Sequence, residues 1–263
     1  MNYWLLGLVV LCGLGIGILS GMFGIGGGAM IVPLLNAVFQ LPMTAASATS
    51  LFSIAPTSIS GSLRHLRQGS VNVKMALQFG IPGALASAVS ATLSGLLPDI
   101  VAMLMTVGVI AVCAYRVFRE ALRETLDEAG HTAESRFKTP ASTALACVSV
   151  GLFAGTIAGL VGVGGGFIIV PFGIAMLGCT MKEMSAISLL AIAIIALPGI
   201  ISHALQSHIQ YEYGIALIIG TIPGASIGVN LISRVPEKAL RLAYGCLLLF
   251  TGAMLLINRF VLS

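Results

Sequence analysis

The chain has 263 residues, of which 57% are hydrophobic and only 8% are charged, against roughly 25% charged residues in ordinary soluble domains. The net charge of +4 comes without a long Lys/Arg cluster, which argues against nucleic acid as a partner. No charged residue occurs between Met1 and Leu63, a stretch that would reach about 95 Å as a straight helix. This composition excludes a soluble domain and predicts an all-α, polytopic protein embedded in a lipid bilayer.

Ten apolar segments follow one another along the chain. In order, they cover residues 3–23, 28–40, 43–64, 73–97, 99–117, 142–161, 166–178, 184–204, 212–233 and 239–258. The first is interpreted as a retained span, because it lacks the basic start and the cleavage site of a signal peptide. The only long polar stretch begins at Arg116, where opposite charges three and four positions apart predict that the helix continues. We interpret residues 118–139 as a polar linker.

An internal repeat divides the chain at this linker. At an offset of 138 residues, 19 of the 49 positions from 21 to 69 are identical, including Ser47 with Ser185 and His65 with His203. Such a fixed offset is typical of duplicated membrane proteins. The sequence therefore predicts two homologous transmembrane repeats, residues 1–117 and residues 140–263.

The second segment of each repeat, 28–40 or 166–178, is too short to cross a bilayer alone. If it completes the preceding span as the far half of a broken helix, each repeat crosses four times, and about eight transmembrane helices result. If it folds back as a re-entrant hairpin, each repeat crosses three times and the two repeats are inverted. The positive-inside rule does not choose between these two models, because both satisfy it. The first does so with both termini in the cytoplasm, and the second with the N-terminus outside.

A run of glycines precedes each short segment, and a proline follows inside it. Three successive glycines favour a break in the helix, and a broken helix within a bilayer must line a cavity or be covered by protein. The helix that starts after the break directs free N–H groups and a positive dipole end at the same place, which suits an anion. The alternative is close helix packing through small residues. The predicted substrate-binding glycines are Gly26, Gly27, Gly28, Gly164, Gly165 and Gly166, with Pro33 and Pro171 as structural residues.

Serines and histidines that match between the repeats supply further candidates. Ser47 and Ser50, like Ser185 and Ser188, are three positions apart and share a helix face, where they either line a substrate path or bond to their own helix. His65 and His203 end predicted spans, where they either cap a helix or serve a proton-linked or anion-binding site. We include all six as candidate substrate-binding residues.

Catalytic and cofactor-binding patterns are absent from the sequence. It has no P-loop motif, no acidic residue deep in a span, and five widely spaced cysteines without metal-ligand spacing. We therefore expect no enzyme activity, no cofactor and no metal site.

The twin glycine-rich motifs, each followed by a Val-Pro pair, together with the serine-bearing segment and the duplication, resemble the sulfite exporter TauE/SafE family over nearly the whole chain. The resemblance implies a permease of the inner, cytoplasmic membrane for small sulfur-containing anions such as sulfite or an organosulfonate. We expect a secondary transporter that exports such an anion, driven by the membrane potential. The alternatives are an anion channel and a non-transporting membrane assembly protein. The sequence is compatible with a homo-oligomer.

Overall fold

The structure is a computed structural model that describes residues 3–94, 98–126 and 140–262. These residues form ten α-helices and close on one continuous apolar core. The helices are α1 (Tyr3–Phe23), α2 (Gly28–Phe39), α3 (Met43–Arg67), α4 (Val73–Leu93), α5 (Asp99–Leu126), α6 (Pro140–Val161), α7 (Gly166–Leu177), α8 (Met181–Leu205), α9 (Tyr211–Ile232) and α10 (Glu237–Leu262). Each predicted segment corresponds to one helix, and α5 continues past Arg116 as expected.

Length and composition mark this bundle as a polytopic membrane protein. Six of the described helices, α1, α4, α6, α8, α9 and α10, are long and apolar enough to cross a membrane. The outer surface carries large exposed apolar side chains such as Leu85, Leu145 and Leu205, which suit contact with lipid. The number of helices that cross the bilayer stays a prediction.

The short helix α2 runs back alongside the helix before it. Helix α1 lies parallel to α9, since Gly13 lies against Leu217 and Gly21 lies against Ala225. The ring of Phe39, at the end of α2, contacts that of Tyr213, near the start of α9, with centroids 4.8 Å apart. The end of α2 therefore returns toward the end of the bundle at which α1 begins.

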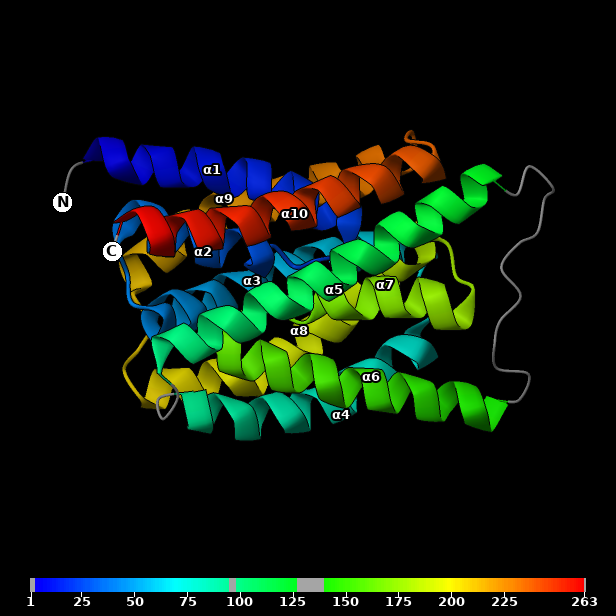
Figure 1. The fold of residues 1–263 in the computed structure, drawn as a ribbon, viewed down its shortest axis with the longest axis horizontal. Helices are drawn as coiled ribbons and strands as arrows, with labels where there is room; N and C mark the ends of the chain where they lie inside the picture. Colours follow the sequence, from blue (N-terminus) through cyan, green and yellow to red (C-terminus); the bar gives the residue numbers. More distant parts are fainter. Residues whose placement is uncertain (1–2, 95–97, 127–139, 263) are drawn as a thin grey trace.

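Helix α7 reverses in the same manner. Helix α6 lies parallel to α4, with Gly151 against Phe79 and Gly159 against Ser87. Phe172 and Met176 of α7 then line the same small pocket as residues near the start of α6. Figure 1 shows α1 and α6 beginning at opposite ends of the bundle, so the two hairpins, α1–α2 and α6–α7, enter from opposite sides.

Rows of glycines join the first arm of each hairpin to a neighbouring helix. Gly13, Gly17 and Gly21 of α1 pack against Gly220, Gly224 and Gly228 of α9, so that the two backbones touch. Gly151, Gly155 and Gly159 of α6 pack in the same way on α4. Small residues at every fourth position allow such close approach of membrane helices. This spacing is readable in the sequence.

The helix contacts pair off in a way that fits the predicted repeats. If α1 to α5 correspond to α6 to α10, each of these contacts has a counterpart. The pair α1–α9 corresponds to α6–α4, the pair α3–α9 to α8–α4, and the pair α2–α10 to α7–α5. Helices α3 and α8 pack on each other at the centre, and α5 packs on α10. The two-repeat organisation itself stays a prediction.

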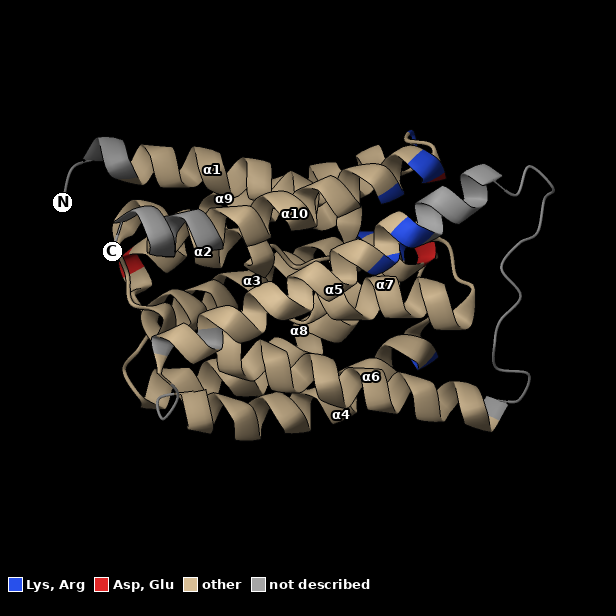
Figure 2. Ribbon diagram, in the orientation of Figure 1, with Lys and Arg blue, Asp and Glu red and all other residues tan. Residues whose placement is uncertain are grey.

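Lys and Arg residues gather at one end of the bundle (Figure 2). The Lys and Arg residues whose side chains the structure describes lie at or next to the ends of α3, α5 and α9 and the starts of α4, α8 and α10. The chain termini lie at the opposite end (Figure 1). We call these the basic end and the terminal end.

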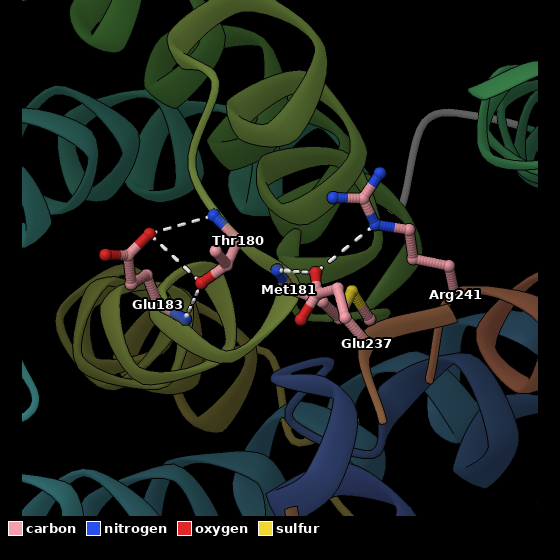
Figure 3. A network of polar contacts seen from close by, with 5 residues as sticks. All are labelled: Thr180, Met181, Glu183, Glu237 and Arg241. Carbon is pink, nitrogen blue, oxygen red and sulfur yellow. Dashed lines mark hydrogen bonds and ion pairs between the residues drawn. The ribbon is translucent and has the colours of Figure 1, made fainter. Parts of the chain in front are cut away.

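A polar network fixes the start of α8 at the basic end (Figure 3). Thr180 and Glu183 form a capping box, in which each side chain bonds to the other residue's backbone N–H. The carboxylate of Glu237, the first residue of α10, accepts the N–H of Met181 and, at 3.2 Å, the Nε–H of Arg241. This network joins α8 to α10.

Candidate functional site at the meeting of two helix breaks

The two glycine breaks meet inside the molecule. A Cβ atom added at Gly28 would lie 2.5 Å from the carbonyl oxygen of Val163, in the second break. One added at Gly166 would lie 2.5 Å from the carbonyl oxygen of Gly24, in the first. Because these distances leave no room for a side chain, the backbones of the two breaks are in direct contact.

Left-handed backbone conformations explain why the breaks are made of glycine. Gly24, Gly26 and Gly27 have φ values of 71°, 76° and 88°, and Gly162, Gly164 and Gly165 have φ values of 73°, 81° and 70°. Residues with a Cβ atom rarely adopt this region. The sequence predicted the breaks, and the structure shows that each reverses the chain.

The starts of α2 and α7 both lie at this meeting point. Their N-cap residues, Gly27 and Gly165, have no side chain to cap the helix. The first N–H groups of a helix have no partner within it, and together with the dipole they form a positive end. Two such ends at one place make a site that favours an anion.

Two isoleucines cover the meeting point. Cβ atoms added at Gly26 and at Gly164 would each meet the side chains of both Ile54, from α3, and Ile192, from α8. Ile54 and Ile192 are fully buried. The breaks are therefore closed in from the side by the two central helices.

Three of the four predicted serines hydrogen-bond to the helix ends that precede the breaks. The Ser47 hydroxyl donates to the carbonyl oxygen of Val161 (2.6 Å), at the end of α6. The hydroxyls of Ser185 and Ser188 donate to the carbonyl oxygens of Gly21 (3.3 Å) and Gly24 (2.7 Å). The serines of one central helix thus satisfy carbonyl groups that the end of another helix leaves free.

Ser50, the fourth predicted serine, differs from the other three. Its side chain is fully buried, and its hydroxyl has no hydrogen-bond partner. The structure therefore leaves this hydroxyl free.

The two predicted histidines lie toward opposite ends of the bundle, near the ends of α3 and α8, and do not come together. His203 is fully buried, with Nε2 3.2 Å from the carbonyl oxygen of Gly159 and its ring 6.1 Å from that of His208. His65 is also buried, and its Nδ1 lies 3.0 Å from Ser70 Oγ.

Pro33 and Pro171, the predicted structural residues, lie inside α2 and α7 and are buried. A proline has no N–H for the carbonyl group four residues earlier, so each short helix lacks one bond in its second turn.

Two buried hydroxyls near the first break were not singled out by the sequence. Ser20 and Ser58 have no hydrogen-bond partner, and both are almost fully buried. Neither has a serine at the matching position of the other predicted repeat, which is the signal that marks the other candidate serines. At the offset of 138 residues, these two positions fall on Ala158 and Ala196.

Two helical hairpins that enter from opposite sides and meet at glycine breaks define a polytopic membrane protein with a transporter-like centre. The chain belongs to the sulfite exporter TauE/SafE family, whose model matches residues 9–255. This is a family of membrane transporters, not of enzymes.

Curated relatives match the chain over nearly its full length. The "Probable membrane transporter protein YdhB" of Bacillus subtilis is 27% identical over 95% of this chain and 99% of its own. The "Probable membrane transporter protein MJ0441" of Methanocaldococcus jannaschii is 27% identical over 96% of both chains. No solved structure matches the chain.

Proposed function

We propose that this protein is a secondary transporter that exports a small sulfur-containing anion, such as sulfite or an organosulfonate, across the cytoplasmic membrane. The observation that carries the proposal is the meeting of two uncapped helix starts at the glycine breaks. The description of the family as sulfite exporters supports the choice of substrate class.

The site favours an anion through its backbone. Each helix start carries a partial charge of roughly +0.5 elementary charge, and the two starts add at one place. The free N–H groups at these starts can donate to the oxygen atoms of an anion. Because they belong to the backbone, they lack the conformational freedom of a long side chain. An oxyanion can therefore be bound with little reorganisation of the protein.

The orientation of the bundle supports export. Lys and Arg residues concentrate on the cytoplasmic side of membrane proteins, which supports an orientation with the basic end in the cytoplasm and the termini outside. An interior-negative potential then drives an anion outward by about 2.3 kcal/mol per charge per 100 mV. ATP hydrolysis is not required for this direction of transport.

A carrier mechanism fits the closed centre. We propose that α1–α2 and α6–α7 are re-entrant hairpins, and that α3, α4, α5, α8, α9 and α10 cross the bilayer. Ile54 and Ile192 flank the breaks, and the breaks touch each other. Movement of one hairpin with its neighbours would open the site to one side at a time.

Efflux from proteoliposomes tests the proposal. Vesicles are loaded with radiolabelled sulfite or sulfoacetate, and an interior-negative potential is imposed. We expect saturable, potential-dependent efflux with counterflow, and its loss in a double variant, Gly27→Leu with Gly165→Leu, that still inserts into membranes. Flux that neither saturates nor shows counterflow would indicate a channel. Equal flux in empty and protein-containing vesicles would favour a non-transporting assembly protein.

A further inference from the structure

We infer that the anion site is one-sided: Ser20 and Ser58 bind the anion at the first break, beside the N-terminus of α2, and the second break closes the site without binding it. This inference rests on the proposed transport of an anion. It adds two substrate-contacting residues and a direction of entry.

Ser58 points into the first break. Its side chain is fully buried, and its hydroxyl has no hydrogen-bond partner in the described structure. A Cβ atom added at Gly26 would lie 3.2 Å from Ser58 Oγ, so the hydroxyl lies directly against the break. A buried hydroxyl without a partner is unfavourable unless something else satisfies it.

Ser20 also lies beside this break, in the last turn of α1. It is 1% exposed, and its hydroxyl also has no partner. A Cβ atom added at Gly27 would lie 3.7 Å from Ser20 Cβ. The first break therefore has two serines with free hydroxyls beside it, next to the uncapped start of α2.

The second break lacks both hydroxyls. Ala158 and Ala196 occupy the corresponding positions at the offset of 138 residues, and both are fully buried. The nearby Ser47 hydroxyl already donates to Val161. The second break therefore has no hydroxyl at the two positions that correspond to Ser20 and Ser58, while Ser50, three residues after Ser47 on the same face of α3, is also buried with a free hydroxyl.

Polar groups continue from the first break toward the basic end. Ser58, Ser62 and His65 follow at i, i+4 and i+7 on one face of α3. His65 Nε2 is buried without a partner, while Nδ1 contacts Ser70. Ser70 in turn lines a cavity of about 400 Å³ with Glu183 and Ile187. An anion from the cytoplasm would enter along this face.

The donors fit a compact oxyanion. Ser58 of α3 and Ser20 of α1 lie beside the first break with free hydroxyls, next to the uncapped start of α2. A sulfite or sulfonate group offers three oxygen atoms around one sulfur, so each donor can find an acceptor.

Sulfite efflux kinetics of Ser20→Ala and Ser58→Ala in proteoliposomes test the inference. Because hydrogen bonds to charged groups are among the stronger ones, we expect each change to raise the KM for sulfite about tenfold or more. The matched control is Ser53→Ala, a buried serine of α3 whose hydroxyl donates to Thr49 and Gly214. Its KM should stay within about twofold of the unchanged protein, since a hydroxyl satisfied by carbonyl groups has no role in the ligand's affinity.

The outcomes separate this inference from the proposed function. If the unchanged protein carries no sulfur anion, the proposed function fails. If it carries sulfite and both variants keep its KM, the transport proposal stands and the one-sided site is wrong. An increase in KM for Ala158→Ser or Ala196→Ser as large as that for the serine variants would also contradict the inference.

A second measurement does not depend on transport. Ser58→Cys, in a chain without the five native cysteines, is exposed to a membrane-impermeant methanethiosulfonate with no substrate present. We expect modification in inverted vesicles, where the basic end faces the reagent, and none in right-side-out vesicles. The reverse pattern would overturn the direction of entry.

Discussion

Gly27 combines a left-handed backbone with a place at the meeting of the two breaks. Its φ of 88° is unfavourable for any residue with a Cβ atom, and an added Cβ would lie 3.1 Å from Ile16. Gly69, in the loop between α3 and α4, has a similar φ of 67° but nothing within 4 Å of the added atom. Substitutions at these two glycines therefore distinguish the effect of backbone strain from a role in the site.

We predict that Gly27→Ala abolishes most anion efflux, whereas Gly69→Ala leaves efflux near its original rate. Each change should cost about 1–2 kcal/mol of stability, because alanine adopts the left-handed region poorly. Thermal unfolding in detergent and efflux from proteoliposomes would be measured on both. Equal loss of efflux in the two variants would show that strain alone, and not the break, explains the effect.

At the scale of residues, the sequence predicted the glycine breaks but not the use of each hydroxyl. Three glycines in a row inside an apolar segment leave few alternatives to a break. The hydrogen-bond partner of a serine hydroxyl depends on which acceptor atom the fold brings to about 3 Å from it. Ser47 and Ser188 bond to helix ends of the other half of the chain, and a sequence gives no sign of such a contact.

The interface between α1 and α9 depends on the absence of side chains along one face of α1. A Cβ atom added at Gly17 would lie 2.5 Å from the carbonyl oxygen of Thr221. Gly15, half a turn away on the same helix, is exposed and has nothing within 4 Å. Both residues are helical, so the change to alanine has the same intrinsic effect on the helix at both positions.

Gly17→Ala should therefore destabilise the protein by about 1–3 kcal/mol, the usual effect of overpacking. Gly15→Ala should be neutral or slightly stabilising, since alanine favours helix more than glycine does. The midpoint of thermal unfolding in detergent would be compared for the two variants. A lower midpoint for Gly15→Ala than for Gly17→Ala would argue against close backbone packing here.

At the scale of helices, the sequence located the elements well and left the direction of the short ones open. Apolar segments bounded by glycine, proline or charge mark where a membrane helix begins and ends. Whether α2 continues or reverses depends on what it packs against. The contact of Phe39 with Tyr213 shows the reversal, and it joins residues that are far apart in the sequence.

At the scale of the whole molecule, the paired contacts and the opposed hairpins fit an inverted duplication. Helix α1 packs on α9, and α6 packs on α4, so each hairpin docks on the other half of the chain. Neither half can then keep its contacts without the other. The positive-inside rule could not choose the orientation from the sequence, because two topologies satisfied it. The position of the basic end, opposite the termini, supports the inverted arrangement that we propose.

This orientation predicts the side of the membrane on which single residues are exposed. Lys238, at the start of α10, lies at the basic end, and Glu212, at the start of α9, lies at the terminal end; both are exposed. In a chain without its native cysteines, Glu212→Cys should react with an impermeant thiol reagent in intact cells. Lys238→Cys should react only after the cells are opened, because its end lies in the cytoplasm. The cysteine-free parent is the control for background. Reaction of Lys238→Cys, and not of Glu212→Cys, in intact cells would place the termini in the cytoplasm and contradict the proposed direction of anion entry.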